Sequence, residues 1–326
     1  MRVVVIGLGS MGKRRIRLLR QLNRELDIAG VDSREDRCRE AREAYQVSAY
    51  TDLEEAMADG GELAFICTSP LSHADLITCC LEHGMHTFTE LNLVSDGYDK
   101  NMLLAKEKGL VLFLSSTFLY RREIDYIRSR VKESGSVLTY SYHAGQYLPD
   151  WHPWENYTEY FIGDSRTNGC RELMAIELPW LSKAFGCIAD VTVKKGKKTM
   201  LKTGYADSYV LLLEHENGTQ GAVLIDVVSR KPVRNLEIFG EDLYLRWDGS
   251  AEGLWEYCME QKQEQRIDLY DSVDRREGYA QFIVENAYLN EIQAFLAEVE
   301  NGKPAAYGFP EDKEILALID RIENIH

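Results

Sequence analysis

Several features that mark other classes of protein are missing from this 326-residue chain. No stretch approaches the roughly 18 consecutive apolar residues that a membrane-spanning helix needs, although hydrophobic residues make up 45% of the sequence. No CxxC pair occurs among the seven scattered cysteines, so we expect neither a disulfide framework nor a metal site. The first strand pattern begins at Arg2, which leaves no space for a signal peptide, and we predict a cytoplasmic protein.

Positive charge is also scarce. The chain has 38 lysines and arginines against 53 acidic residues, a formal net charge of −15. This excess of negative charge disfavours nucleic acids and anionic membranes as partners. The length suggests about two domains, and no internal repeat or low-complexity segment interrupts them.

The N-terminal residues carry a nucleotide-binding pattern. An unbroken apolar run, Val3 to Ile6, is typical of a parallel strand buried on both faces. Gly7, Gly9 and Gly12 follow with GxGxxG spacing, and a helical pattern begins at Lys13. This order predicts a dinucleotide turn, in which the three glycines allow the turn, the approach of a pyrophosphate and close helix–strand packing.

A second strand pattern ends in an acidic residue. Asp32 lies 20 residues after Gly12, where an acid accepts hydrogen bonds from the ribose hydroxyls of adenosine. Because Asp32 would repel a 2′-phosphate, we predict NAD as the cofactor. NADP stays possible, since Arg34 can bind a phosphate or stack on adenine. The alternative is an ordinary glycine turn with a helix-capping aspartate.

Two more turns follow strand patterns. Residues 63–67 lead into Thr68-Ser-Pro-Leu-Ser-His73, and residues 86–90 lead into Glu90-Leu-Asn92. Ligands of a doubly wound sheet lie beyond the carboxyl ends of its strands, so we expect both turns to face the cofactor. His73 is alternatively only a residue of the first helical turn. The predicted cofactor-binding residues are Gly7, Gly9, Ser10, Met11, Gly12, Asp32, Ser33, Arg34, Thr68, Ser69, Pro70, His73 and Glu90.

In combination, these motifs resemble the Gfo/Idh/MocA family of glucose–fructose oxidoreductase and inositol dehydrogenase-like enzymes. The resemblance rests on the glycine motif, Thr68-Ser-Pro70 with His73, Glu90, and the ending Glu291-Ile-Gln-Ala-Phe295…Gly302-Lys-Pro304. It implies an NAD(P)-dependent oxidoreductase acting on a secondary alcohol of a sugar, cyclitol or sugar derivative.

The fold expected from the resemblance agrees with the alternation of strand and helix patterns up to about residue 120. We predict an α/β protein with an N-terminal Rossmann domain, a doubly wound parallel sheet, over residues 1–120. Residues 121–326 should form an α+β domain with a large open, mainly antiparallel sheet that binds substrate and forms oligomers.

The chain departs from the family at two catalytic positions. Leu91 stands where the family has a lysine, and Ile176 stands where it has a histidine, four residues after an aspartate matched here by Glu172. The mechanism is therefore not implied by the resemblance. Two alternatives stay open: a redox-neutral lyase, epimerase or glycosidase that retains its NAD, and a catalytically silent, cofactor-sensing binding protein.

The second domain offers candidates for the missing groups. Residues 146–157 interleave aromatic rings with His152 and acids, which suits a sugar but also a packed structural loop. Glu177 borders the apolar stripe of a helix that Pro179 should kink, where burial would suit it to proton transfer unless it forms an ion pair. We rank Glu177 and His152 equally as the catalytic base, with Glu172 in support. The predicted substrate-binding residues are Leu91, Asn92, Tyr147, Trp151 and Trp154.

The predicted strands near residues 209–213 and 222–228 are apolar on both faces. Helices of the same chain can cover one face, and the other needs a partner. We therefore predict a homo-oligomer, a dimer or tetramer, formed through this sheet.

Overall fold

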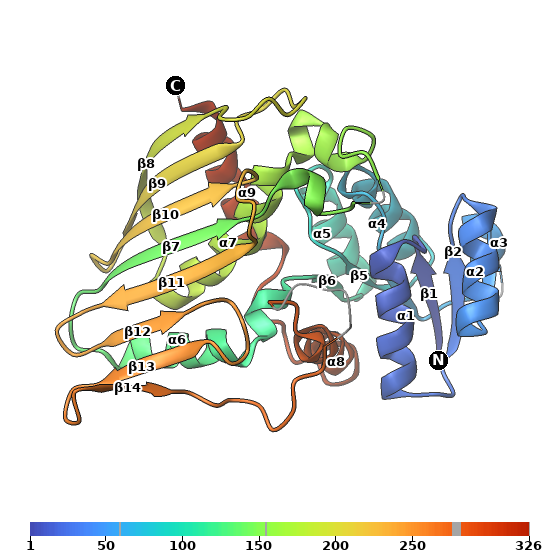
Figure 1. The fold of residues 1–326 in the computed structure, drawn as a ribbon. Coiled ribbons are helices and arrows are strands. Elements are labelled where there is room, and N and C mark those ends of the chain that lie inside the picture. Colours follow the sequence, from blue (N-terminus) through green and yellow to red (C-terminus); the bar gives the residue numbers. More distant parts are fainter. Residues whose placement is uncertain (59, 154, 276–281, 326) are drawn as a thin grey trace. The chain divides into compact units, whose positions relative to one another are not determined.

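The computed structural model describes residues 1–58, 60–153, 155–275 and 282–325 (Figure 1). The chain divides into two compact units, Met1–Ser116 with Leu289–Glu314, and Thr117–Tyr288 with Ile315–His326. The first break lies close to the expected boundary at residue 120. The second break was not predicted. Residues 289–314 belong to the first unit, although they follow most of the second unit in the sequence.

The first unit is a parallel sheet of six strands in the order β3-β2-β1-β4-β5-β6. The order reverses between β1 and β4, so the carboxyl ends of these two strands form the switch point where such sheets bind ligands. Its elements are β1 (Arg2–Ile6), α1 (Ser10–Leu22), β2 (Asp27–Val31), α2 (Glu35–Tyr45), β3 (Ser48–Tyr50), α3 (Leu53–Met57), β4 (Leu63–Ile66), η1 (Pro70–Ser72), α4 (His73–Glu82), β5 (His86–Thr89), α5 (Tyr98–Lys108) and β6 (Leu112–Leu114).

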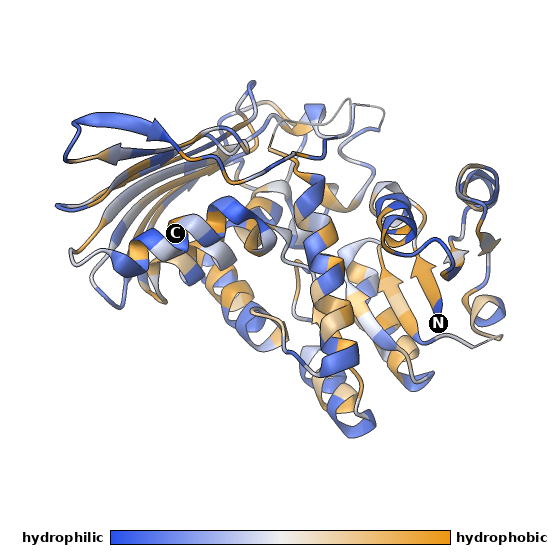
Figure 2. Ribbon diagram, turned by 90° about the horizontal axis from the view of Figure 1, so that it is seen from below, coloured by the Kyte–Doolittle hydropathy of each residue, from blue (hydrophilic) through white to orange (hydrophobic). Residues whose placement is uncertain are grey.

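Apolar side chains fill both faces of this sheet, and its central strands are coloured as hydrophobic in Figure 2. Phe65, Phe88 and Phe113 come from three neighbouring strands and stack in a row, with ring centroids 4.9 and 5.2 Å apart. Phe295 packs its ring edge-on against all three. This contact explains why the segment after residue 288 belongs to the first unit.

The second unit is built on an eight-stranded sheet in the order β14-β13-β12-β11-β7-β10-β9-β8 (Figure 1). All neighbouring strands are antiparallel except β7 and β10, which are parallel. Its elements are η2 (Thr117–Tyr120), α6 (Arg122–Glu133), β7 (Thr139–Gly145), η3 (Leu148–Asp150), η4 (Phe161–Gly163), η5 (Ser165–Thr167), α7 (Gly169–Phe185), β8 (Ile188–Gly196), β9 (Ser208–His215), β10 (Gln220–Asp226), β11 (Val233–Phe239), β12 (Tyr244–Trp247), β13 (Leu254–Cys258) and β14 (Gln263–Arg266).

Two further helices, α8 (Glu285–Asn301) and α9 (Phe309–Asn324), divide their residues between the units. The predicted fold class, a Rossmann-type parallel sheet and a separate mainly antiparallel sheet, is confirmed. The sequence pattern also predicts a long helix from about Tyr279 to Val299, and the first residues of that range lie outside the described part of the chain. Within the described part of the chain, no helix is long and apolar enough to cross a membrane.

Alternation along the strands gives the second sheet two different faces. Tyr209, Leu211 and Leu213 of β9 are buried, and α7 packs against β7, β9 and β10. Val210 and Leu212, which alternate with them, are exposed. One face of this sheet is therefore covered by helices of the same unit, and the other carries exposed apolar side chains.

Candidate functional site

The glycine turn after β1 has the backbone geometry that its motif predicts. Gly7 has a φ of +93°, and a Cβ there would lie 2.7 Å from the carbonyl oxygen of Cys67. A Cβ on Gly12 would lie 1.8 Å from the carbonyl oxygen of Gly7, so a side chain at either position would displace the turn. Gly9 caps α1 without a side-chain hydrogen bond, which leaves the helix N-terminus able to bind an anion.

The residues that follow the glycines differ in their surroundings. Ser10 is exposed at the start of α1, and the Met11 sulfur lies 3.1 Å from Nη1 of Arg14. Ser33 is exposed after β2. Arg34 forms an exposed ion pair with Asp36, 2.5 Å apart, which keeps its guanidinium near the end of β2.

Asp32 is buried and is already hydrogen-bonded. Its Oδ2 accepts from the backbone N–H of Leu8 at 2.9 Å and from Nη1 of Arg37 at 3.2 Å, and its Oδ1 accepts from the Arg34 N–H at 3.0 Å. The carboxylate thus fixes the glycine turn and retains room for a further donor. Arg37, which sequence reasoning missed, would also lie 3.7 Å from a Cβ on Gly9.

The turn after β4 is held to the turn after β5 through His73. The imidazole lies 3.0 Å from the Thr68 carbonyl oxygen through Nε2 and 2.6 Å from Oδ1 of Asn92 through Nδ1. Burial lowers the pKa of His73, although the Asn92 hydrogen bond opposes this effect. His73 therefore holds the two predicted loops together. Within the first of them, the Ser72 hydroxyl donates to the Ser69 carbonyl at 2.8 Å, and Pro70 is the first residue of η1.

Glu90, the residue that follows β5, lies in a buried ionic cluster. Arg15 of α1 donates from Nε to Glu90 at 2.6 Å and from Nη2 to Glu291 at 2.7 Å, and its guanidinium lies 4.5 Å from the Phe88 ring centroid. Glu291 also accepts from the Ser116 backbone N–H at 2.7 Å. These contacts leave Glu90 a positioning role, and the next residue, Leu91, adds only a partly buried apolar side chain.

Glu177 of α7 is completely buried and saturated with donors. It accepts hydrogen bonds from the Tyr142 hydroxyl at 2.7 Å, from Nε1 of Trp180 at 2.7 Å and from Nε of Arg234 at 2.8 Å. The helix continues through Pro179 without ending. Both carboxylate oxygens are already engaged with donors, so the contacts favour the ion-pair alternative over the predicted role of base.

Glu172, one turn after the start of α7, has the opposite environment. Its Oε2 is buried and has no hydrogen-bond partner among the described residues. Burial raises the pKa of Glu172 to about 7, against a smaller opposing effect of Arg234. The hydroxyls of Tyr160 and Tyr205 are likewise buried, and no described group forms a hydrogen bond of acceptable geometry with either. Burial is the main cause that raises the pKa of both tyrosines, and the Glu172 carboxylate adds a smaller effect. The backbone of Gly169 lowers the pKa of Tyr205 in the opposite direction.

These three side chains come from different segments. Glu172 lies on α7, Tyr160 directly precedes η4, and Tyr205 lies on the loop between β8 and β9. The two tyrosines carried no motif in the sequence, so pattern reading could not have selected them.

The aromatic segment after β7 is partly ordered by its own contacts. The His152 ring stacks on Tyr160 with centroids 4.9 Å apart, and its Nδ1 lies 3.5 Å from Glu155. Trp151 donates from Nε1 to the Gln146 carbonyl at 3.1 Å, and the Arg230 guanidinium lies 3.6 Å from the Tyr147 ring centroid. Trp154 lies outside the described residues.

The first unit fits a dinucleotide in three respects. The glycines of the turn leave its backbone without side chains, so a pyrophosphate can approach it. The N-terminus of α1 can bind an anion, and Asp32 lies directly after β2, where a ribose would bind. Among the described residues, no group of three or more His, Cys, Asp and Glu side chains is arranged to hold a metal ion.

Comparison with known proteins agrees with this geometry. Residues 1–115 match the family described as an oxidoreductase family with an NAD-binding Rossmann fold. Myo-inositol 2-dehydrogenase of Thermotoga maritima is 25% identical over an alignment covering 98% of this chain and 94% of that protein.

Two solved structures share the fold along nearly the whole chain. A UDP-N-acetylglucosamine 3-dehydrogenase from Acidithiobacillus ferrooxidans has a TM-score of 0.76 at 18% identity, covering 99% of this chain and 96% of its own. An oxidoreductase from Agrobacterium radiobacter, in complex with NAD+, L-tartaric acid and magnesium, has a TM-score of 0.80 at 16% identity, covering 98% and 94%. These findings agree with the predicted resemblance: residues 1–115 match the Gfo/Idh/MocA oxidoreductase family with its NAD-binding Rossmann fold, and the chain is similar over nearly its whole length to a myo-inositol 2-dehydrogenase.

Proposed function

We propose that the protein oxidises a secondary alcohol of a sugar, cyclitol or sugar derivative with NAD, and that Glu172 is its catalytic base. The desolvated and unpaired Oε2 of Glu172 carries this proposal. The dehydrogenase relative from Thermotoga maritima, which acts on myo-inositol, supports the substrate class.

The reaction needs a hydride acceptor and a proton acceptor. NAD, when bound, accepts the hydride from the alcohol carbon. Glu172 takes the hydroxyl proton on Oε2, and with a pKa of about 7 it is well matched to general-base catalysis near neutral pH. Its position equals that of the family aspartate, so a carboxylate here would act without the usual lysine and histidine, which Leu91 and Ile176 replace.

The other candidates take different parts in this proposal. Glu177 holds Tyr142 and Arg234 in place, and His152 supports Tyr160 through ring stacking. The unpaired Glu172 oxygen also favours turnover over a catalytically silent role, because a binding protein gains nothing from a desolvated carboxylate without partners.

The test is the reduction of NAD and NADP, followed at the nicotinamide absorbance band with a panel of sugars, cyclitols and sugar acids. Glu172→Gln should lower turnover on the order of 100-fold or more while leaving NAD affinity unchanged. Glu159→Gln, an exposed acid on a neighbouring segment, is the matched control and should stay active. Normal turnover by the Glu172 variant would remove Glu172 as the base.

A further inference from the structure

Two tyrosine hydroxyls within electrostatic range of Glu172 lack a hydrogen-bond partner of acceptable geometry among the described residues. Three other tyrosines of the second unit use theirs: Tyr142 donates to Glu177, Tyr270 donates to Glu123 at 2.7 Å, and Tyr140 bonds His215 at 3.0 Å. The oxygens of Tyr160 and Tyr205 are buried, and no group of the described chain forms a hydrogen bond of acceptable geometry with either. Proteins rarely leave such groups unsatisfied, because desolvation without a hydrogen bond is unfavourable.

The segments that carry both tyrosines are held in place by other contacts. Asp207, at the end of the β8–β9 loop, accepts from the backbone N–H groups of Lys198 at 2.6 Å and Thr199 at 3.0 Å. The Lys202 N–H donates to the Tyr157 hydroxyl at 3.0 Å, which joins this loop to the segment before η4.

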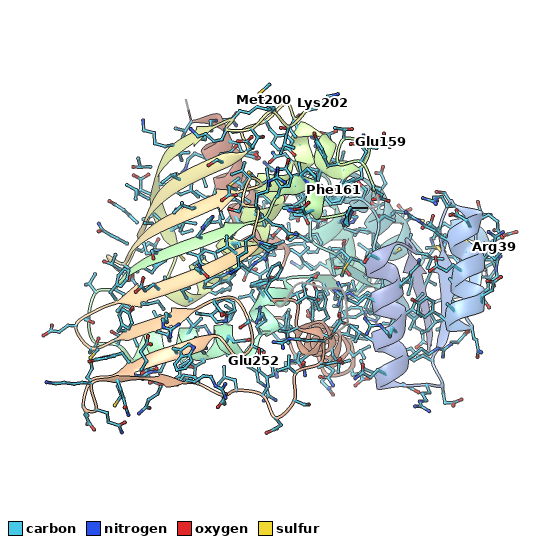
Figure 3. The ribbon with its side chains drawn as sticks, viewed as in Figure 1. Arg39, Glu159, Phe161, Met200, Lys202 and Glu252 are labelled. Carbon is cyan, nitrogen blue, oxygen red and sulfur yellow. The ribbon has the colours of Figure 1, made fainter. Side chains whose placement is uncertain are left out.

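Figure 3 shows the two segments side by side, with Met200 and Lys202 on the loop and Glu159 and Phe161 on its neighbour. The arrangement keeps the two hydroxyls in place before any ligand arrives, and preorganised polar groups of this kind favour a matching ligand.

We propose that Tyr160 and Tyr205 bind two substrate hydroxyls beside the one whose proton Glu172 accepts. This inference rests on the proposed function and narrows its substrate class. The substrate would be a polyol with hydroxyls on at least three nearby carbons, the reacting one included, such as an intact pyranose or cyclitol. A simple secondary alcohol or a monodeoxy sugar would leave a buried tyrosine hydroxyl unpaired.

The expected discrimination is large. A site built to hydrogen-bond a substrate hydroxyl rejects the analogue that lacks it by up to about 10⁴-fold. We expect kcat/KM to fall at least tenfold for each deoxy analogue that removes a hydroxyl read by Tyr160 or Tyr205.

The first experiment compares the melting temperatures of three variants without substrate. Tyr160→Phe and Tyr205→Phe remove a buried, unpaired hydroxyl and should keep or raise the melting temperature. Tyr142→Phe, the control, removes a hydroxyl that donates to Glu177 and should lower it. If both site variants lost stability as the control does, their hydroxyls would be bonded within the protein and the inference would be wrong.

The second experiment pairs enzyme and substrate changes. Myo-inositol, D-glucose and their monodeoxy analogues are assayed with the wild type, Tyr160→Phe and Tyr205→Phe. On the parent sugar, kcat/KM of each variant should be at least tenfold lower than that of the wild type. For the deoxy analogue that lacks the hydroxyl bound by the substituted tyrosine, kcat/KM of the variant should be no lower than for the parent sugar. Equal wild-type activity on parent and deoxy substrates would overturn the inference while leaving the proposed oxidoreductase intact. If no alcohol is oxidised although NAD binds, the proposed function fails instead, and the melting temperatures still decide the state of the two hydroxyls.

Discussion

Two glutamates on α7 show how surroundings separate side chains of identical chemistry. Glu177 accepts from three donors and is completely enclosed, whereas Oε2 of Glu172, five residues earlier, is desolvated without a partner. The sequence pattern placed Glu177 beside an apolar stripe and Glu172 at the family's aspartate position, but carried no information about donors from distant strands. Tyr142 and Arg234, which donate hydrogen bonds to Glu177, lie 35 and 57 residues away from it in the sequence.

The pH dependence of the reaction tests Glu172. Its pKa is raised from 4.5 to about 7 by burial, so activity should rise with pH as Glu172 loses its proton near pH 7. The Glu172→Gln variant should lack this ionisation in its profile of kcat/KM against pH. An unchanged profile in an active variant would assign the ionisation to another group.

The raised pKa of Glu172 also predicts how the stability of the folded protein depends on pH. A carboxyl with a raised pKa favours its protonated form in the folded state, so its contribution is greatest below pH 4.5 and is lost as the pH rises to about 7. Each pKa unit corresponds to about 1.4 kcal/mol. Glu172→Gln should therefore stabilise the protein above pH 7 and much less at pH 5, as measured by urea unfolding at the two values.

Asp32 and Arg37 make a prediction about the cofactor. Arg37 lies 3.2 Å from Asp32 and offsets its charge, which weakens the repulsion of a 2′-phosphate. Arg37→Ala should weaken NADP binding much more than NAD binding. Asp32→Ser should instead reduce the ratio by which NAD binds more tightly than NADP. Fluorescence titration with both cofactors measures this, with Arg39→Ala, on the same helix, as the control. Tighter NADP binding by the Arg37 variant would contradict the prediction.

At the scale of elements, the order of strands and helices followed from local patterns. Glycine spacing after β1 and apolar runs in β1 and β4 identified the Rossmann unit, because buried parallel strands have few polar positions. β14 was missed because all four of its residues are exposed. The parallel pairing of β7 with β10 also has no local signal, since strand partners are chosen by tertiary packing.

The buried cluster of Arg15, Glu90 and Glu291 predicts a strong dependence of stability on an acid near the C-terminus. Removing one partner of a buried ion pair leaves a charge without compensation, at a cost of roughly 3–5 kcal/mol. Glu291→Ala should lower the unfolding free energy by about this amount, while Glu300→Ala, on the same helix, should have little effect. Chemical unfolding of both variants provides the comparison, and equal stability would show that Glu90 alone compensates Arg15.

At the scale of the molecule, the second sheet presents an apolar surface. Val210, Leu212 and Leu224 are 43, 54 and 39% exposed, and their neighbours on β9 and β10 are buried beneath them. We propose that a second copy of the chain covers this face. Leu212→Lys with Leu224→Lys should then reduce the oligomer to a monomer by light scattering, whereas Met259→Lys should not. A wild-type monomer at micromolar concentration would contradict the proposal.

The return of residues 289–314 to the first unit makes that unit discontinuous in the gene. A fragment that stops at Ser116 would lack Phe295 beside its aromatic row and Glu291 beside Arg15. Exchanging the nucleotide-binding half between relatives by recombination therefore requires two crossovers, one near each break, and a hybrid made with a single crossover inherits a mismatched core.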